Sequence, residues 1–265
     1  ETMKEVTVVI PNYNGMKYLA ECMTSLCREQ QNAPGYEVLI IDNASVDGSV
    51  EYLQKEWCGE GVRLISLPEN TGFCHAVNLG IREAKTPYVI LLNNDTKAEA
   101  GFVRGLYDAI RENEKIFSVS AKMLMWDRPE LMFSACGGAA IYRRSVFEEI
   151  GYFDEEHFAY LEDLDIGYRA RIYGYENRYE PKAAVLHYGS ASTGSRYNPR
   201  KTLLASANSI YVIGKNMPLL QCILNLPFFL LGFGIKFLFF CKKRMGKLYL
   251  KGLAAGLKRS VGTTG

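Results

Sequence analysis

The residue types around Asp95 fit the binding of a metal ion. Asp95 ends the polar stretch Asn93-Asn94-Asp95, which directly follows the apolar run 88–92. A carboxylate oxygen at such a place suits Mg²⁺ or Mn²⁺ that bridges phosphate groups. A turn residue or a helix cap is the alternative interpretation of a lone Asp after a strand.

Asp42 ends another apolar run, and Asp47 follows five residues later. A carboxylate at the end of a strand in an α/β sheet is well placed to accept hydrogen bonds from a base or a ribose. Asp42 fits this role, whereas Asp47 fits the N-cap of the next helix equally well.

Glu162, Asp163 and Asp165 place three carboxyl groups within four residues of the chain. Like charges this close raise the pKa of a partly buried carboxyl group, which is one way to produce a general base. Tyr160 and Leu161 precede the cluster and indicate partial burial. The alternative is an acidic first turn that complements the N-terminus of a helix.

His187 closes a short apolar run and precedes the small-residue stretch 189–194, which suits phosphate binding. Arg196 and Arg200 follow and are placed to face the same negative charge. A structural role is the more common one for a lone histidine, so both interpretations stay open for His187.

The composition excludes several classes of protein. With 265 residues, 48% hydrophobic and 23% charged, the chain is neither disordered nor collagen-like. A net charge of +2 is too balanced for a protein held to nucleic acid mainly by its charge. Seven cysteines without a CxxC motif argue against a disulfide framework or structural zinc site, and charged residues before the first apolar run argue against a signal peptide. We therefore expect a cytosolic protein with reduced thiols.

Three common motifs are absent from the sequence. It contains no GxGxxG fingerprint, no GxxxxGK[ST] loop and no GxSxG elbow. Their absence weakens the dehydrogenase, nucleoside triphosphatase and α/β-hydrolase interpretations.

The elements that must position these side chains alternate between strands and helices. The pattern predicts strands over residues 6–10, 36–41, 62–67 and 88–92, and helices over 17–28, 48–55 and 73–84. Short apolar strands separated by helices indicate a mostly parallel sheet with helices on both faces. Ligands bind beyond the carboxyl ends of such strands, so the turns 11–15, 42–47 and 93–95 should lie along one rim. Further along, the pattern predicts helices over 145–150 and from the acidic cluster to about Gly174, and a short strand over 185–187.

The C-terminal stretch 218–241 is mostly Leu, Ile and Phe, and Lys242-Lys243-Arg244 follows directly. A membrane-spanning helix needs about 20 apolar residues, and here Pro227 and Lys236 interrupt the run. We expect two short helices in a membrane interface, where the cations meet anionic headgroups. A helical hairpin against the domain or a second subunit and a true membrane span are the alternatives.

Taken in order, six stretches make the chain resemble the family 2 glycosyltransferases with a GT-A fold, and within them the rhamnosyltransferase-like branch. The stretches are VTVVIPNYNG (6–15), VLIIDNASVDGS (38–49), ENTGFCHAVNLGI (69–81), VILLNNDT (89–96), CGGAAIYRRSVFEEIGYFDEEHFAYLEDLDIGYRARIYGY (136–175) and VLHYGSASTG (185–194). They lie within residues 5–215. Between 126 and 138 this chain is shorter than similar proteins, so either this member has a short segment there, or a disordered loop is absent from this sequence.

The resemblance implies a role for each matching residue. Asp163 would be the general base, paired with Glu162, and Asp95 would be the metal-binding member of a DxD-type motif that here reads Asn93-Asn94-Asp95. His187 would be a further ligand of the Mg²⁺ or Mn²⁺. The residues implied to contact the nucleotide sugar are Pro11, Tyr13, Asp42, Asn70, Gly72 and Asn94, and Arg200 is added to them from its charge and position.

The resemblance implies an inverting, metal-dependent hexosyltransferase of cell-surface polysaccharide synthesis. The favoured donor is dTDP-L-rhamnose, and the expected acceptor is a lipid-linked saccharide. A UDP-sugar transferase, a non-catalytic saccharide-binding or scaffold protein of the same fold and a nucleotidyltransferase are the alternatives. We expect a GT-A domain over residues 1–215 and a hydrophobic helical segment over 216–265 that associates with membrane or forms a homodimer. The enzyme would lie on the inner face of the cell membrane without crossing it and without binding nucleic acid.

Overall fold

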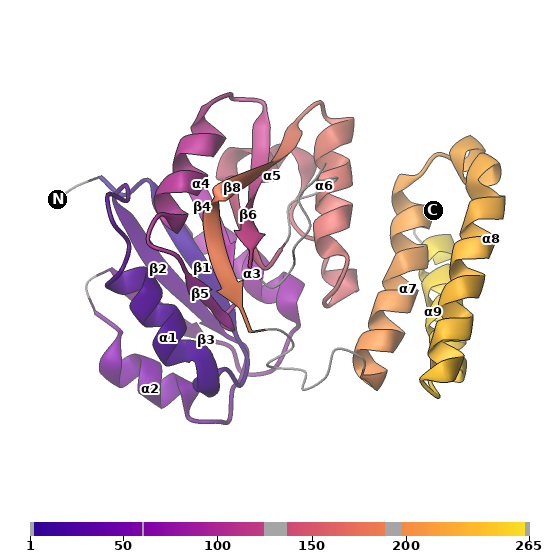
Figure 1. Ribbon diagram of the computed structural model, residues 1–265, viewed down its shortest axis with the longest axis horizontal. Helices are drawn as coiled ribbons and strands as arrows, with labels where there is room; N and C mark the ends of the chain where they lie inside the picture. The colour runs from indigo at the N-terminus through magenta and orange to yellow at the C-terminus, as the bar shows by residue number, and fades with distance from the viewer. Residues whose placement is uncertain (1–2, 60, 125–136, 189–197, 263–265) are drawn as a thin grey trace.

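The computed structural model describes residues 3–59, 61–124, 137–188 and 198–262. They form an α/β body and, beside it, a group of long C-terminal helices (Figure 1). The strands are β1 (Val6–Asn12), β2 (Tyr36–Asp42), β3 (Val62–Ser66), β4 (Tyr88–Leu92), β5 (Thr96–Ala98), β6 (Ile116–Met123), β7 (Ala139–Arg143) and β8 (Glu176–His187). The helices of the body are α1 (Met16–Cys27), α2 (Ser49–Glu56), α3 (Phe73–Glu83), α4 (Phe102–Arg111), α5 (Arg144–Ile150) and α6 (Glu162–Ile172), and a 3₁₀ turn covers Glu155–His157.

The strands form one sheet in the order β3-β2-β1-β4-β7-β6-β8-β5. β1 pairs in parallel with β2 and β4, and β2 pairs in parallel with β3. The carboxyl ends of these strands therefore meet at one edge, as the sequence predicts. The other half of the sheet is mixed, because β7 runs antiparallel to β4 and β6 and β5 runs antiparallel to the end of β8.

Alternating residues of the central strands fill two hydrophobic cores, one on each face of the sheet. Val8 and Ile10 of β1 pack with α1, α2 and α4, whereas Val9 packs on the opposite face with α3, α5 and α6. Each of these three side chains is fully buried. The period of two explains why the buried strands read as continuous apolar runs in the sequence.

The contact between α3 and β1 is close enough to require glycine. A Cβ added to Gly80 would lie 2.3 Å from Cγ1 of Val9. We expect Gly80→Ala to lower the free energy of unfolding by about 1–3 kcal/mol through overpacking, measured by urea denaturation. Gly232→Ala is the matched control, because Gly232 is also helical and its added Cβ meets nothing within 4 Å. That control should be neutral or slightly stabilising, and equal destabilisation by both variants would contradict the packing argument.

The sequence analysis did not predict β5, α4, β6 and β7, and it took the last three residues of β8 for the whole strand. Strand β8 has 12 residues, from Glu176 to His187. Its first part alternates charged residues with uncharged ones, because this part of the strand lies near the edge of the sheet and is only partly buried. The apolar run alone therefore underestimated its length.

The C-terminal region differs from the expected pair of short helices. It consists of α7 (Pro199–Asn216), the continuous α8 (Leu219–Lys242) and α9 (Gly246–Gly262). Pro227 lies inside α8 without ending it, since a proline removes one backbone hydrogen bond and the flanking Leu and Phe residues sustain the helix. Among the described residues, α8 is the one helix long and apolar enough to cross a membrane by length and composition.

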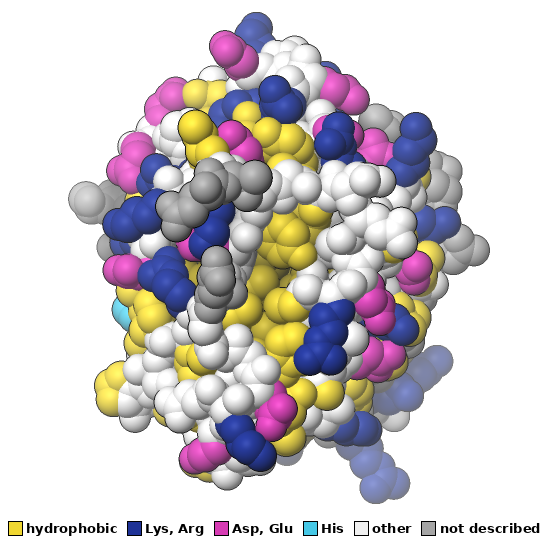
Figure 2. Space-filling view, turned by 90° about the vertical axis from the view of Figure 1, so that its left-hand side faces the viewer, with side chains coloured by type: hydrophobic (Ala, Val, Ile, Leu, Met, Phe, Trp, Pro, Cys, Tyr) yellow, Lys and Arg dark blue, Asp and Glu magenta, His cyan; other side chains and the backbone are white. Residues whose placement is uncertain are grey.

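The helices α7, α8 and α9 lie side by side at one end of the molecule (Figure 1). The predicted domain boundary between residues 215 and 216 falls at the C-terminal end of α7, which packs along α9. On the face of the body away from these helices, basic and acidic side chains are interspersed around a strip of hydrophobic ones (Figure 2). That face therefore carries no broad field of one charge.

Candidate active site

The loops that follow β1, β2 and β4 are joined by hydrogen bonds at the carboxyl edge of the sheet. The Asn12 side chain donates from Nδ2 to Oδ1 of Asp42 over 2.7 Å. Its Oδ1 accepts a 2.7 Å hydrogen bond from Nδ2 of Asn94. Asn12 is 1% exposed. Sequence reasoning missed Asn12, although it lies inside the predicted turn 11–15, because its role depends on two partners far away in the chain.

Asp42 lies at the predicted rim with both of its carboxylate oxygens engaged. Besides the bond from Asn12, Oδ2 of Asp42 accepts a 2.9 Å hydrogen bond from the backbone N–H of Ser45. Asp42 is 1% exposed, so it organises the two loops from within. Tyr13 is exposed beside it, and Pro11 pairs with Ile41 in the β1–β2 register. Tyr13 therefore offers an aromatic face to a ligand at this rim.

Gly72 begins α3 in a conformation that suits glycine. Its φ is +92°, and an added Cβ would lie 2.7 Å from Cδ2 of Phe158. Asn70 accepts a 3.0 Å hydrogen bond from the Gly72 N–H, and the Asn43 side chain donates to the Gly72 carbonyl over 2.9 Å. The predicted residues Asn70 and Gly72 thus lie against the loop that leads to the acidic cluster.

The structure brings Asp95 and His187 together across 92 positions of sequence. Oδ1 of Asp95 lies 3.3 Å from Nε2 of His187, and both side chains are largely buried. The reason is the β5–β8 ladder, which pairs Thr96 with His187 and so places the residue before Thr96 against the imidazole.

This pair fits a divalent metal ion. Two ligands at neighbouring corners of an octahedral ion lie about 3 Å apart when each metal bond is about 2.1 Å long, close to the observed separation of Asp95 and His187. A carboxylate oxygen and an imidazole nitrogen both suit Mn²⁺, and the oxygen also suits Mg²⁺.

A second group of potential ligands, Asp154, His157 and Asp165, is already neutralised by a lysine. The ligand atoms of these three residues lie within 4.8 Å of one another. However, Nζ of Lys215 lies 2.5 Å from Asp154 and 3.1 Å from Asp165. Burial raises the pKa of Asp154, but the hydrogen bond and the charge of Lys215 outweigh this effect and hold the pKa below its usual value. The ammonium group therefore occupies the position that a cation would take.

Glu162 and Asp163 begin α6 after a backbone turn of unusual conformation. Phe158, Tyr160 and Leu161 all have positive φ, at 58°, 75° and 66°. Such conformations are costly for residues other than glycine and persist only where the surroundings enforce them. We call residues 158–161 the catalytic loop, because they lead directly into Glu162 and Asp163, the pair predicted to supply the general base.

One side chain from the C-terminal helices holds the catalytic loop in place. Asn208 of α7 is fully buried, and its Nδ2 lies 3.0, 3.0 and 2.8 Å from the carbonyl oxygens of His157, Ala159 and Tyr160. Sequence reasoning missed Asn208, because nothing in a helical pattern marks a buried asparagine whose partners are backbone carbonyls.

Burial raises the pKa of both carboxyl groups in the Glu162–Asp163 pair. Burial and the neighbouring Asp163 charge raise the pKa of Glu162 to about 8. Its Oε2 is buried without a hydrogen-bond partner among the described residues. Burial also raises the pKa of Asp163, an effect that hydrogen bonds from the N–H groups of Gly137 and Leu164 partly offset. Asp163 is therefore the member of the pair that ionises first.

We expect the stability of the protein to depend on the proton of Glu162. A folded-state pKa of about 8, against an ordinary 4.5, means that folding favours the neutral acid. Its contribution to stability is complete below about pH 4.5 and is lost as the pH rises through 8. Urea denaturation at several pH values should show a shallower decline for Glu162→Gln than for the parent protein over this window. Parallel curves for the two proteins would contradict this expectation.

Asp165 faces away from the Glu162–Asp163 pair. It is fully buried, and its carboxylate contacts Arg169 at 3.0 Å and Lys215 at 3.1 Å. Asn216 also donates to it over 2.7 Å. The predicted cluster of three carboxylates therefore divides into two at the site and one that attaches α7 to α6.

Arg200 lies in the first turn of α7, with its guanidinium 4.8 Å from the ring centroid of Phe158. Because Phe158 packs against Gly72, Arg200 lies at the border of the predicted nucleotide-sugar site. Arg196 and the small-residue stretch 189–194 lie outside the described residues. The question of a short or missing loop between Asp127 and Gly137 also falls largely on residues outside them, 125–136.

Comparison with known families and relatives points to sugar transfer. The family model for glycosyl transferase family 2 matches residues 7–124. The N-acetylglucosaminyl-diphospho-decaprenol L-rhamnosyltransferase of Mycobacterium tuberculosis is 27% identical over 260 residues, which cover 77% of this chain and 82% of that relative. The putative teichuronic acid biosynthesis glycosyltransferase TuaG of Bacillus subtilis is 30% identical over 121 residues. These cover 45% of this chain and 47% of TuaG.

Solved structures share the fold. The structure of GalNAc-T7 with UDP, GalNAc and Mn²⁺ matches with a TM-score of 0.65 and 17% identity over 80% of this chain and 48% of that one. Residues 1–349 of S. aureus TarS with UDP-GlcNAc match with a TM-score of 0.60 and 19% identity, over 81% of this chain and 68% of that one. The chain thus spans about half of the GalNAc-T7 chain. At these identities the likeness concerns the fold, and the predicted GT-A architecture is confirmed.

Proposed function

Because residues 7–124 match the family model for glycosyl transferase family 2, we propose that this chain is an inverting, metal-dependent hexosyltransferase acting on a lipid-linked saccharide. The supporting observation is the Gly137-Gly138 dipeptide, which joins the two candidate chemical groups. The Gly138 carbonyl accepts a 3.0 Å hydrogen bond from the N–H of Asn93, two residues before Asp95. The Gly137 N–H donates to Asp163 over 3.3 Å. A side-chain pair suited to a divalent cation and a carboxyl pair at one rim would supply the two groups that the proposed transfer uses, a cation for the leaving diphosphate and a general base.

The donor would bind along the strand ends, with its base and ribose at Pro11, Tyr13 and Asp42. Asp95 and His187 would hold Mg²⁺ or Mn²⁺, which stabilises negative charge on a departing diphosphate. Asp163 takes the proton from an acceptor hydroxyl, whose oxygen attacks the anomeric carbon from the face opposite the diphosphate. One carbon–oxygen bond forms as the bond to the diphosphate breaks, and the configuration at the anomeric carbon inverts.

The favoured donor is dTDP-L-rhamnose, because the mycobacterial relative is an L-rhamnosyltransferase. A UDP-sugar is the second candidate, because the TarS and GalNAc-T7 structures contain UDP or UDP-GlcNAc. A donor panel separates them, with release of the nucleotide diphosphate measured in the presence of Mn²⁺. We expect the nucleotide diphosphate to be released fastest from dTDP-L-rhamnose. If no donor releases it, a non-catalytic saccharide-binding protein becomes the favoured interpretation.

We place the enzyme on the inner face of the cell membrane, with α8 lying in the interface. None of the 24 residues of α8 is buried. Their apolar surface is flanked by Lys242, Lys243 and Arg244, and anionic lipids of the inner leaflet attract such cations. Helices α7 and α9, which precede and follow α8 in the chain, pack on each other. A helix that crossed the bilayer would have its two neighbours on opposite sides of it, so this packing favours an α8 that lies flat in the interface.

Surface variants of α8 test the membrane proposal. Leu231 and Ile235 are 64% and 60% exposed and lie one turn apart. We expect Leu231→Asp with Ile235→Asp to weaken co-sedimentation with phosphatidylglycerol vesicles about 10-fold or more. The matched control changes Ile172 and Tyr173, which are 63% and 53% exposed on the body, to Asp. If the variant still binds vesicles but a dimer of the parent protein dissociates, α8 contacts a second subunit and not the membrane.

A further inference from the structure

The charge of this protein is divided very unevenly along the chain. Residues 199–265 contain eleven of the 31 Lys and Arg residues and none of the 29 Asp and Glu residues. Residues 1–198 therefore carry a net charge of −9 and the C-terminal helices +11, although the whole chain has only +2. An all-cationic helical region next to an acidic body points to an anionic ligand of the helices.

The helix arrangement gathers many of these cations at one end. The Thr202 hydroxyl at the start of α7 lies 3.6 Å from the sulfur of Met245 in the α8–α9 turn. An added Cβ at Gly252 would touch Ser206 and one at Gly214 would touch Ser260, so α7 and α9 run in the same direction. Helix α8, which connects them in the sequence, runs in the opposite direction. The start of α7 and the α8–α9 turn consequently share one end of the helical group (Figure 1). We call this the cationic end, and its basic residues are Arg200, Lys201, Lys242, Lys243, Arg244 and Lys247.

The cationic end adjoins the catalytic loop. Arg200 lies 4.8 Å from the ring centroid of Phe158, and Nζ of Lys201 lies 5.2 Å from that of Tyr160. Glu162 follows Tyr160 by two residues. A group bound at this end is thus a neighbour of the acidic pair that begins α6.

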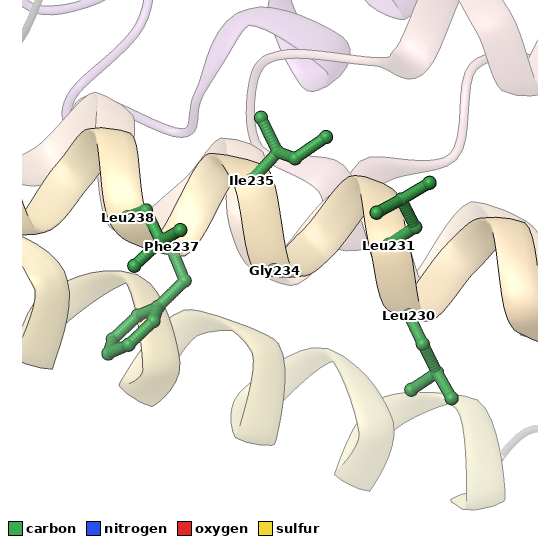
Figure 3. Close-up of a pocket in the computed structure, with 6 residues that line it drawn as sticks. All are labelled: Leu230, Leu231, Gly234, Ile235, Phe237 and Leu238. Carbon is green, nitrogen blue, oxygen red and sulfur yellow. The ribbon is translucent and has the colours of Figure 1, made fainter.

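An apolar surface continues from the cationic end along α8. A shallow groove of about 410 Å³ is lined by Leu230, Leu231, Gly234, Ile235, Phe237 and Leu238. Phe237 points toward α9, whereas Leu231 and Ile235 point away from it (Figure 3). Leu238 lies one turn before Lys242, and the twelve positions from Leu230 to Lys242 extend over about 18 Å of helix. The apolar surface of α8 therefore leads directly into the cationic end. An amphiphile with an anionic head group and a hydrocarbon tail would fit this order.

We propose that the cationic end binds the diphosphate of a polyprenyl-diphosphate-linked acceptor, whose hydrocarbon chain lies along α8. This proposal rests on the proposed function, since it assigns the acceptor of the same reaction. The diphosphate would place the attached saccharide at the catalytic loop, within reach of Asp163. Lipid-linked and unlinked saccharides would then be distinguished at the cationic end rather than at the nucleotide-sugar site.

Calorimetry of farnesyl diphosphate binding to the full chain tests the proposal. The buffer contains EDTA, so that no metal ion can bridge the diphosphate to the donor site. The variant replaces Lys242, Lys243 and Lys247 by Gln, and the matched control replaces Lys236, Lys251 and Lys258, which are also exposed lysines of α8 and α9. We expect the first variant to weaken binding about 10-fold or more and the control about 2-fold or less. Farnesol and inorganic diphosphate should each bind more weakly than farnesyl diphosphate. If both variants lose affinity for farnesyl diphosphate equally, the binding is a general attraction by positive charge and not a specific site, and the proposal is overturned.

Two further measurements separate this site from its competitors. With active enzyme, the ratio of kcat/KM for a diphospholipid-linked saccharide to that for its alkyl glycoside should fall about 10-fold in the first variant. If the first variant loses binding to phosphatidylglycerol vesicles but keeps its affinity for farnesyl diphosphate, these lysines bind bulk anionic lipid, and the proposal is overturned. If no donor is turned over but the binding difference persists, the proposed function fails while the diphosphate site stands.

Discussion

Replacement of Asp163 by Asn is expected to lower kcat for sugar transfer by about 100- to 10,000-fold, the usual cost of losing a general base. The amide keeps the shape of the side chain, but its one oxygen can accept from only one of the N–H groups of Gly137 and Leu164, and it cannot take a proton from the acceptor hydroxyl. Nucleotide affinity should persist, because the residues proposed to bind the base and the ribose lie at the carboxyl ends of β1 and β2, on other elements than Asp163. Single-turnover transfer and equilibrium binding of the nucleotide diphosphate measure the two effects separately.

Glu162→Gln and Asp165→Asn are the controls for this prediction. Glu162, with a pKa of about 8, is largely protonated at pH 7, so the amide reproduces its neutral form and most activity should remain. Asp165→Asn should lower thermal stability more than turnover, because Asp165 holds Lys215 and Arg169 instead of facing the acidic pair. If Asp163→Asn keeps near-normal turnover and Glu162→Gln is inactive, Glu162 and not Asp163 is the general base.

Loss of the Asp95–His187 pair is the second large effect we expect. Asp95→Ala and His187→Ala should each lower kcat about 100- to 1,000-fold, because each removes a ligand of the cation that stabilises the leaving diphosphate. The double variant should be little worse than either single one, since the two residues act as a unit. Titration of activity with Mn²⁺ after treatment with a chelator should show that each variant needs a higher Mn²⁺ concentration to reach half of its maximal activity.

An exposed aspartate provides the control for the metal prediction. Asp108 forms an ion pair with Arg104 on the surface of α4 at 2.7 Å, and its change to Asn should leave both turnover and Mn²⁺ dependence within about 2-fold. Full activity of Asp95→Ala in the absence of divalent ions would contradict a metal-dependent mechanism.

The rim of the site could be predicted from sequence because it depends on local signals. Each strand from β1 to β4 is a short apolar run that ends in polar residues, and parallel pairing brings those ends together whatever the details of the loops. Asp42, Asn94 and Asp95 therefore lie where the pattern indicated. The pairing of Asp95 with His187 was expected from the rim and the family resemblance, but its structural cause, the three-residue strand β5, is too short to leave a pattern.

The acidic cluster shows where local signals end. Glu162, Asp163 and Asp165 look equivalent in sequence, and what separates them is Lys215 and Asn216, about 50 residues further along. The same holds for α8, where Pro227 and Lys236 suggested two helices. Whether a proline ends a helix depends on the cost of one lost hydrogen bond against the packing and propensity of all its neighbours, which a single position does not reveal.

The three contacts of Asn208 have a consequence for how such enzymes exchange parts during evolution. A recombination joint before α7 would give the body foreign helices that lack the amide holding the catalytic loop. A joint after Asn216 would instead set a foreign α9 against this chain's α7, at an interface where Gly252 and Gly256 approach Ser206 and Ala207 too closely for larger residues. We therefore expect the helices and the body to be exchangeable only together, and a chimera that replaces α8 while keeping this body must carry Asn208 and the α7–α9 interface as one block.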